Sequence, residues 1–372
     1  MVKQVLLTIQ QEDVMSYEAD VLALKYAGTF FGADRAVAER LVQTGKAKDV
    51  NELRVRSTVT IVESQGAIAA RQVMFVYAPR PREFSYDSVR KLAVNTLYQL
   101  KYSKSITPNP RSMVTTIHGS GFGLDELEII TSQVAGYLEA FRNSEFPESL
   151  ETIVIVDLDP RRVERLRGAV DALLAQEPSA TAVNGETWGY AINVDALRGI
   201  SPGSSAPVEN GSKRSRAITI ESTPAAPTAT EREAERSEAK KHIFVAIPFR
   251  PETEDLWEFG IYMPIRDLDL RCSRIDHEAF SGDIFDQIKF RIETAAAIVA
   301  VLDGYNPNVF LELGYAMGKG IPSILLAQKS MIDEKKLPFD IQSQRCIGYT
   351  NIKDCKKLLT TELTRFQKDG VI

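Results

Sequence analysis

Short apolar runs alternate with helical patterns over the first half of the chain. Apolar runs bounded by polar and turn residues are typical of buried strands, and they predict strands at residues 5–9, 21–26, 59–62, 73–77, 113–117 and 153–156. Apolar positions spaced three and four apart predict helices at residues 33–44, 86–103, 124–142 and 160–175. Because strands and helices alternate, we expect a mostly parallel sheet that is covered by helices on both faces.

The same alternation returns after residue 240. The pattern predicts strands at residues 243–247, 271–275, 295–302 and 321–327, and helices at residues 282–294, 307–319 and 352–367. This order of elements predicts a second, small doubly wound parallel sheet. Sheets of this kind bind ligands at the carboxyl ends of their strands.

Residues 200–240 differ from both halves. They are rich in serine, proline, alanine and charged residues, they contain no aromatic residue, and they lack hydrophobic periodicity. Such a composition is typical of a solvated, disordered linker. We therefore expect an α/β domain at residues 1–199, a linker at 200–240 and a second α/β domain at 241–372.

Composition narrows the class of protein. With 44% hydrophobic and 26% charged residues among 372, the chain can build ordinary globular cores, and its net charge of −5 argues against general coating of nucleic acid. No run approaches a membrane span, and the start lacks the apolar core of a signal peptide. The cysteines at 272, 346 and 355 have no zinc-site spacing, so we expect reduced thiols, a cytoplasmic location and no metal.

Carboxylates gather where the strands of the second domain are predicted to end. Asp303 follows strand 295–302, Asp276 follows strand 271–275, and Asp283 stands at the start of the next helix. Glu312 lies within an otherwise apolar helical segment. Like charges in a partly desolvated crevice raise the pKa values of some carboxyl groups, which suits acid, base or nucleophile roles. Asp283 alone could instead be a structural helix cap, and Asp276 an ordinary loop residue. Glu312 could instead face solvent on its helix.

The chain between Asp303 and Glu312 contains a turn that sets the direction of the next helix. Asn306, Pro307 and Asn308 form this turn, with Pro307 expected near the first helical position. The first strand of the domain ends at Pro248 and Phe249, which we expect on the same side of the sheet. The N-termini of the helices beside this crevice can receive phosphate.

These residues resemble a known superfamily. The segments Cys272 to Asp276 and Ser281 to Ile284, together with the string from Asp303 to Pro322, are similar to the nucleoside 2-deoxyribosyltransferase-like and TIR-like nucleotide hydrolases. The resemblance covers about 130 residues. It implies that Glu312 attacks or stabilises the anomeric carbon of a sugar, and that Asp303 holds the sugar or base. It also implies a substrate pocket that includes Pro248, Phe249, Asp283, Asn306 and Asn308.

Cleavage of an N-glycosidic bond leaves oxocarbenium character on the sugar, which a nearby carboxylate stabilises or traps covalently. Nicotinamide leaves NAD from an already cationic ring, so NAD needs no general acid. A purine nucleoside needs a proton donor, and Asp276 or Asp303 could serve. No cofactor is expected, because NAD itself is the expected substrate.

A glycine-rich loop marks the first domain. Gly119, Ser120, Gly121 and Gly123 follow a predicted strand, lie next to His118, and precede a helix, where backbone can approach phosphate closely. Together with residues 20–28 and 31–37, the loop resembles macro domains and the N-terminal domain of leucine aminopeptidases. Macro domains have an asparagine where residues 25–27 read Lys-Tyr-Ala. This departure favours sensing of an ADP-ribose-like nucleotide, or partner contact, over ADP-ribose hydrolysis.

Three functions remain open from the sequence. The first is an NAD glycohydrolase that is regulated by the macro-like domain and acts as a homo-oligomer in bacterial antiviral defence, as the resemblance implies. The second is a nucleoside 2-deoxyribosyltransferase or nucleotide N-glycosidase that uses the same Glu312. The third is a non-catalytic pair of nucleotide-binding domains that acts through assembly.

Overall fold

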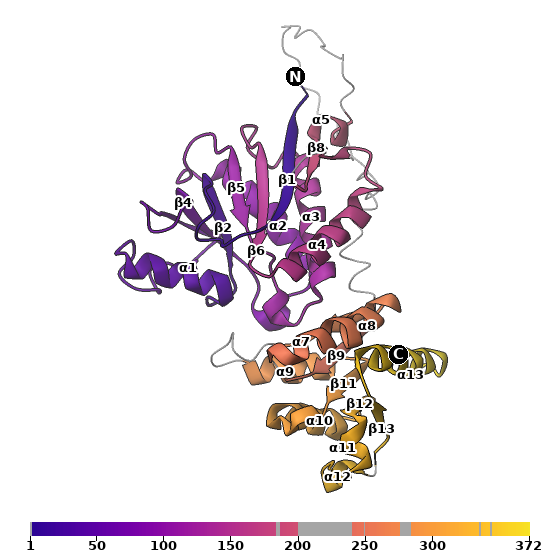
Figure 1. Ribbon diagram of the computed structural model, residues 1–372. Coiled ribbons are helices and arrows are strands. Elements are labelled where there is room, and N and C mark those ends of the chain that lie inside the picture. The colour runs from indigo at the N-terminus through magenta and orange to yellow at the C-terminus, as the bar shows by residue number, and fades with distance from the viewer. Residues whose placement is uncertain are drawn as a thin grey trace, which may run out of the picture.

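The computed structural model describes residues 2–183, 187–199, 240–248, 250–275, 284–334, 336–342 and 344–372. Within these residues the chain forms two α/β domains, each built on its own sheet (Figure 1). The expected fold class is therefore confirmed. The predicted linker at 200–240 lies almost wholly outside the described residues, so the proposed domain boundaries remain a prediction.

The N-terminal domain contains an eight-stranded sheet with the order β3-β4-β2-β5-β6-β1-β8-β7. Its strands are β1 (Gln4–Gln11), β2 (Val21–Tyr26), β3 (Val59–Glu63), β4 (Gln72–Tyr77), β5 (Ser112–Thr115), β6 (Thr152–Asp157), β7 (Ala180–Ala182) and β8 (Tyr190–Asn193). The pairs joining β4, β2, β5, β6 and β1 are parallel, and antiparallel strands flank them at both edges. All six predicted strands are present. The two short strands β7 and β8 were missed, because three or four residues are too few to show a period.

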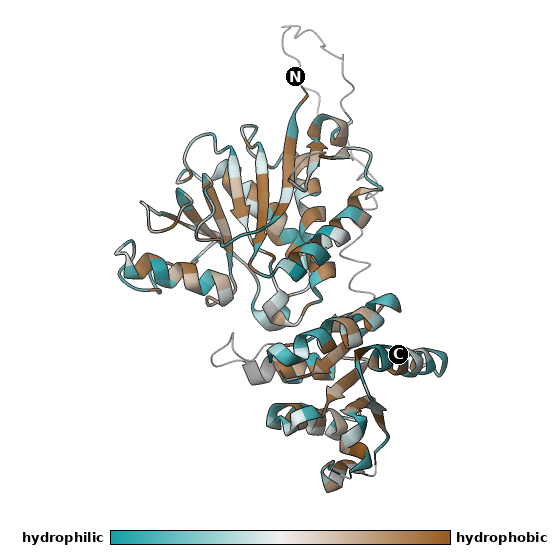
Figure 2. Cartoon of the chain, viewed as in Figure 1, coloured by the Kyte–Doolittle hydropathy of each residue, from teal (hydrophilic) through white to brown (hydrophobic). Residues whose placement is uncertain are grey.

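Helices cover both faces of this sheet, as predicted. The principal helices are α1 (Gly32–Gln43), α2 (Tyr86–Tyr102), α3 (Glu126–Arg142) and α4 (Pro160–Leu174), and the short turns are η1 (Pro81–Glu83), η2 (Ser120–Phe122) and α5 (Val194–Leu197). Helix α1 packs on one face in a core with alternate residues of β2 and β4, whereas α2, α3 and α4 pack on the other face. The brown strands in Figure 2 show that the central strands are apolar along most of their length.

The C-terminal domain contains five parallel strands in the order β10-β9-β11-β12-β13. The strands are β9 (His242–Ala246), β10 (Arg271–Ser273), β11 (Ala297–Val301), β12 (Ser323–Gln328) and β13 (Cys346–Tyr349). The helical elements are α7 (Pro251–Asp255), η3 (Leu256–Tyr262), α8 (Met263–Asp267), α9 (Ile284–Glu293), η5 (Asp303–Tyr305), α10 (Pro307–Gly318), α11 (Lys329–Asp333), α12 (Phe339–Gln342) and α13 (Ile352–Lys368). Helices α9 and α10 pack on one face, while η3, α8 and α13 pack on the other.

This strand order places a topological switch between β9 and β11. The chain leaves β9 toward β10 on one side of it and then continues with β11 on its other side. In doubly wound sheets the crevice beyond the carboxyl ends of two such strands is where ligands bind. The sequence predicted four of these five strands and missed β13. It also did not identify the helical run from Pro251 to Asp267, whose prolines at 251 and 264 interrupt the apolar spacing.

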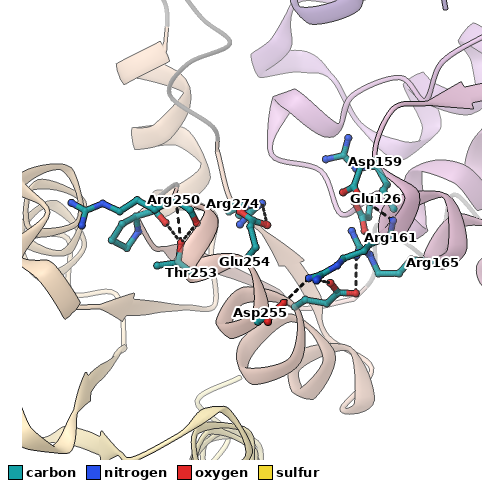
Figure 3. A network of polar contacts seen from close by, with 12 residues as sticks. Glu126, Asp159, Arg161, Arg165, Arg250, Thr253, Glu254, Asp255 and Arg274 are labelled. Atoms are coloured by element: carbon teal, nitrogen blue, oxygen red, sulfur yellow. Dashed lines mark hydrogen bonds and ion pairs between the residues drawn. The ribbon is translucent and has the colours of Figure 1, made fainter. Parts of the chain in front are cut away.

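The two domains contact each other through α3, α4 and the glycine loop on one side, and β10, α9, η3 and α8 on the other. Arg161 on α4 pairs with Asp255 at 2.6 Å, and Arg165 pairs with Glu258 at 3.0 Å (Figure 3). Leu127 on α3 packs against the C-terminal core. Leu127 thus contributes to the contact between the two domains.

Among the helices that the structure describes, none is long and apolar enough to cross a membrane.

Candidate active site

The crevice at the switch point is formed by the chain segments that follow β9 and β11. These strands are neighbours, with Ala246 opposite Ala300, so both segments leave the sheet at the same edge. Pro248 follows β9 and is buried, and Asp303 with Gly304 follows β11. The structure thus places Pro248 and Asp303 at adjacent strand ends. Phe249 lies outside the described residues.

Asp303 is held in place by the two strands beyond β11. Its Oδ1 accepts a hydrogen bond of 2.8 Å from the backbone N–H of Gln328, and its Oδ2 accepts one from the hydroxyl of Tyr349. Burial raises the pKa of Tyr349, and the Asp303 carboxylate raises it further, so Tyr349 remains a protonated donor. Burial likewise raises the pKa of Cys346 to about 11, with a contribution from Asp303. The half-buried carboxylate therefore has a fixed orientation at the edge of the sheet.

Helix α10 begins directly after this carboxylate. Asn306 caps the helix by accepting a 2.9 Å hydrogen bond from the N–H of Asn308, and Pro307 is the first helical residue, as expected. Asn306 thus has a structural role in the described contacts, while Asn308 is exposed. Because the helix starts at the carboxyl edge of the sheet, its positive end lies at the same edge as the predicted site.

Glu312 lies within α10 and is only 6% exposed. It follows Val309 by one turn and precedes Ala316 by another, and these two residues pack on the sheet together with Leu313. The sequence raised the alternative that Glu312 faces solvent, and this alternative is wrong. A buried carboxylate is costly unless it is hydrogen-bonded or paired, so a glutamate at this helix position indicates a specific role.

Arg250 is a site residue that the sequence analysis missed. Its Nη1 lies 3.2 Å from the point where a Cβ on residue 304 would stand, and Gly304 has a positive φ of 74°. The hydroxyl of Thr253 donates to the carbonyl of Pro248 at 2.6 Å and to that of Arg250 at 2.8 Å, which fixes the loop after β9 (Figure 3). Arg250 is exposed, and within the described part of the chain no carboxylate pairs with its guanidinium.

A second arginine stands at the end of β10. The guanidinium of Arg274 lies 4.5 Å from the ring centre of Trp257 and pairs with Glu254 at 3.1 Å (Figure 3). Arg250 and Arg274 thus follow the neighbouring strands β9 and β10. Arg250 could have been sought among the residues that directly follow the predicted strand 243–247.

Asp276 and Asp283 lie outside the described residues, as does His277. Of the carboxylates that were expected to converge, the structure places Asp303 and Glu312. Their predicted catalytic and binding roles remain predictions.

The glycine loop of the N-terminal domain has two glycines in the left-handed region. Gly119 has a φ of 113° and Gly123 a φ of 73°, and between them Ser120 and Gly121 begin the turn η2. A Cβ on residue 123 would stand 3.2 Å from Arg291 and from Ile275 of the C-terminal domain. The loop therefore lies against the other domain.

The helix that follows the loop is already capped. Asp125 accepts hydrogen bonds from the N–H groups of Leu127 at 3.0 Å and Glu128 at 3.4 Å. Its carboxylate therefore occupies the position that a phosphate would take at the start of α3. The predicted ligand contacts of Gly119, Ser120, Gly121 and Gly123 remain a prediction.

His118 is buried next to the loop. Burial, with a smaller contribution from Lys25, lowers its pKa to about 3, so the imidazole is neutral at physiological pH. It contacts the hydroxyl of Thr115 at 3.2 Å. A neutral, buried ring fits a structural role better than contact with phosphate.

Lys25 stands where macro domains have an asparagine. Its Nζ lies 2.5 Å from Asp34 on α1 and 5.1 Å from the ring centre of Phe122. A buried ion pair therefore fills this part of the domain.

Comparison with known proteins gives matches to solved structures. No protein-family profile and no curated protein matches the sequence. Among solved structures, the chain is similar to a Trypanosoma brucei macrodomain in complex with ADP, with 14% identity over 44% of this chain and 67% of that chain, and a TM-score of 0.33. An Oceanobacillus iheyensis macrodomain with ADP has 12% identity over 47% and 99%, with a TM-score of 0.33.

A Clostridium botulinum CMP N-glycosidase is also similar, with 17% identity over 33% of this chain and 99% of that chain, and a TM-score of 0.28. Macrodomains are thus among the structures that the chain is similar to. The deoxyribosyltransferase-like and TIR-like resemblance remains a prediction. At these identities and scores we draw no activity from the matches, and we base the proposed function on this chain's own residues.

Proposed function

We propose that the C-terminal domain hydrolyses the N-glycosidic bond of a nucleotide, with NAD as its substrate and Glu312 as its central catalytic residue. The observation that carries this proposal is the burial of Glu312 in the helix that follows the switch-point strand. A carboxylate kept 6% exposed near the carboxyl edge of a doubly wound sheet is suited to stabilise positive charge on a bound sugar.

The reaction needs only water as a second reactant. The bond between the ribose anomeric carbon and the pyridinium nitrogen breaks, and its electron pair neutralises the ring, so nicotinamide leaves without protonation. The Glu312 carboxylate stabilises the oxocarbenium character that develops on the ribose. Water then adds to the anomeric carbon and releases a proton, giving ADP-ribose.

One further feature supports a nucleotide over a nucleoside. Arg250 is exposed and has no carboxylate partner among the described residues, so it is available to a phosphate. Asp303, oriented by Tyr349 and by the Gln328 N–H, is suited to accept hydrogen bonds from ribose hydroxyls.

The N-terminal domain has a regulatory role in this proposal, in which it binds a nucleotide ligand and influences the C-terminal domain through their shared surface. Such an enzyme would serve bacterial antiviral defence and act as a homo-oligomer. Cells that express Glu312→Gln should then lose protection from phage, and the rate per chain should rise with protein concentration. Equal protection by the variant would contradict the defence role, and a constant rate in a monomer would contradict self-association.

The test of the activity is chromatography of the full chain incubated with NAD, NADP, CMP and a set of nucleosides. We expect release of nicotinamide from NAD, lowered roughly 100- to 1,000-fold in Glu312→Gln, which is the usual loss when one charge-stabilising group is removed. Glu293→Gln is the matched control, because Glu293 is an exposed glutamate on α9 that pairs with Lys319. Full turnover by Glu312→Gln with an unchanged melting temperature would contradict the proposal.

The product pattern separates the alternatives. Release of cytosine from CMP, without release of nicotinamide, would indicate a nucleotide monophosphate N-glycosidase. Exchange of bases between two nucleosides would indicate a transferase. Tight binding of nucleotides, unaffected by Glu312→Gln and without any product, would indicate a pure binding domain.

A further inference from the structure

The glycine loop of the N-terminal domain contacts two buried residues of the C-terminal domain. The carbonyl of Phe122 accepts a 2.9 Å hydrogen bond from the Nε of Arg291 on α9. A Cβ built on Gly123 would stand 3.2 Å from Arg291 and 3.2 Å from Ile275, which follows β10. Arg291 is 9% exposed and Ile275 is 3% exposed. The domains therefore pack against each other at this loop with no room for a side chain on residue 123.

Aromatic packing fixes the loop within its own domain. The ring of Phe122 is 1% exposed, and it packs edge-to-face against the rings of Phe31 and Phe84, with 5.2 Å between ring centres in both pairs. A Cβ on Gly119 would stand 2.8 Å from Phe84, so the loop has no space to move toward this ring. The Phe122 carbonyl therefore holds Arg291 from a fixed position.

Helix α9 joins this contact to the helix that carries Glu312. Ile288 and Ile292 of α9 share one core with Leu313 of α10, which is the residue next to Glu312. Ile275 belongs to the same core. Closely packed elements have few alternative arrangements, so a displacement of α9 at the loop passes to α10. The loop of one domain is thus linked by packed contacts to the helix of the other that carries the candidate catalytic glutamate.

The backbone conformation of Gly123 alone does not explain this arrangement. Its φ of 73° already favours glycine, because a side chain in the left-handed region is strained. Gly45, after α1, has the same φ of 73°, but nothing lies within 4 Å of a Cβ built there. Of these two glycines, Gly123 is the one that also lies against the other domain. The pair therefore separates backbone strain from the contact between the domains.

We propose that the N-terminal domain positions Glu312, with the glycine loop holding Arg291 and, through it, helix α9. Arg291 is a positioning residue in this arrangement, because it acts on the reaction through Glu312 and not on the substrate. The placement of a catalytic group matters to fractions of an ångström, so loss of this contact lowers the rate. A ligand that moves the Phe122 carbonyl would change the rate by the same route. This inference rests on the proposed function, since it concerns the same glutamate.

The first test compares Gly123→Ala with Gly45→Ala in the release of nicotinamide from NAD by the full chain. In Gly123→Ala the added Cβ displaces Arg291 and Ile275, so we expect kcat to fall roughly 10-fold while KM changes less than about 3-fold. Gly45→Ala has the same strain without the contact, and its kcat should equal that of the unmodified chain. Unchanged kcat in Gly123→Ala would overturn the proposal, and so would an equal fall in Gly45→Ala.

Substitution of Arg291 provides a second test. Arg291→Met keeps the length of the side chain and removes the donor to the Phe122 carbonyl, so kcat should fall roughly 10-fold. Arg291→Lys retains a donor and should recover part of this loss. Because both changes act through one contact, Gly123→Ala combined with Arg291→Met should fall little below the lower of the single variants. Losses that multiply in the double variant would overturn the proposal.

Hydrogen exchange supplies a readout that does not need turnover. In the full chain, the backbone amides of α9 and α10 should exchange faster in Gly123→Ala than in Gly45→Ala, because the packing between the domains is loosened. Unchanged exchange in both helices would overturn the proposal even where nicotinamide is released. If the unmodified chain releases no nicotinamide, the proposed reaction fails, and the exchange rates alone decide whether the loop holds these helices.

Discussion

The carboxylate of Asp125, which caps α3 in the N-terminal domain, accepts a 3.0 Å hydrogen bond from the backbone N–H of Cys272 in β10 of the C-terminal domain. The same carboxylate lies 3.2 Å from Arg266 on α8. The side chain of Asp125 is fully buried. One residue therefore caps a helix in one domain and accepts a hydrogen bond from an edge strand of the other. The stabilities of the two domains are therefore linked.

We expect Asp125→Ala to lower the free energy of unfolding by about 2–4 kcal/mol, because it removes the cap of α3 and leaves the buried Cys272 N–H without its acceptor. Asp125→Asn keeps one capping oxygen, but its NH2 group then faces the Cys272 N–H and Arg266, which are also donors, so we expect a loss of similar size. Calorimetry should show one transition for the unmodified chain and two for Asp125→Ala. A single transition in both, at the same temperature, would contradict the linkage.

The sheets were predictable from the sequence, whereas the surface between the domains was not. Apolar runs such as residues 21–26 are buried along their whole length, and they form strands as predicted. Aspartate is a common residue at helix N-caps, and Asp125 caps α3. Its second role is to accept a hydrogen bond from Cys272, which lies 147 residues further along the chain. A pattern of neighbouring residues cannot indicate a contact over that separation.

In the candidate site, too, local features were predictable from the sequence, whereas contacts between distant segments were not. The turn at Asn306 and the helix that carries Glu312 follow from local residue preferences, and both were predicted. Arg250 was missed because its position beside Gly304 arises only when β9 pairs with β11.

Two glycines on packed helices should respond in opposite ways to the same substitution. A Cβ on Gly136 in α3 would stand 2.3 Å from the carbonyl oxygen of Arg90 in α2, so Gly136→Ala should destabilise the protein by about 2–3 kcal/mol. Gly168 in α4 has nothing within 4 Å, so Gly168→Ala should stabilise it by about 0.5–1 kcal/mol through helix propensity. Urea unfolding measures both. A destabilised Gly168→Ala would show that this face of α4 is already filled.

The buried histidines should make the protein less stable in mild acid. Burial lowers the pKa of His118, and of His242 in β9, to about 3, whereas each is near 6.5 in the unfolded chain. Between these values the unfolded state binds protons that the folded state does not. Stability is therefore complete above about pH 6.5 and falls as the pH drops toward 3.

Each histidine should lower the free energy of unfolding by about 2 kcal/mol between pH 7 and pH 5. His118→Gln removes one of the two titrations, so its loss over this range should be smaller than that of the unmodified chain by about 2 kcal/mol. Urea midpoints at pH 7 and pH 5 provide the comparison. Equal losses in the two proteins would show that His118 is protonated in the folded state.

Arg250 offers a test of substrate class that does not depend on the identity of the base. If its guanidinium binds a phosphate, Arg250→Gln removes a charge-assisted hydrogen bond, and KM for a nucleotide should rise roughly 10- to 100-fold. The corresponding nucleoside has no phosphate to lose, so its KM should not change. Arg345→Gln is the control, because Arg345 is an exposed arginine that pairs with Glu362. Equal rises in KM for the nucleotide and the nucleoside would mean that Arg250 instead shapes the loop at Gly304. Only a direct phosphate contact would affect the two substrates differently.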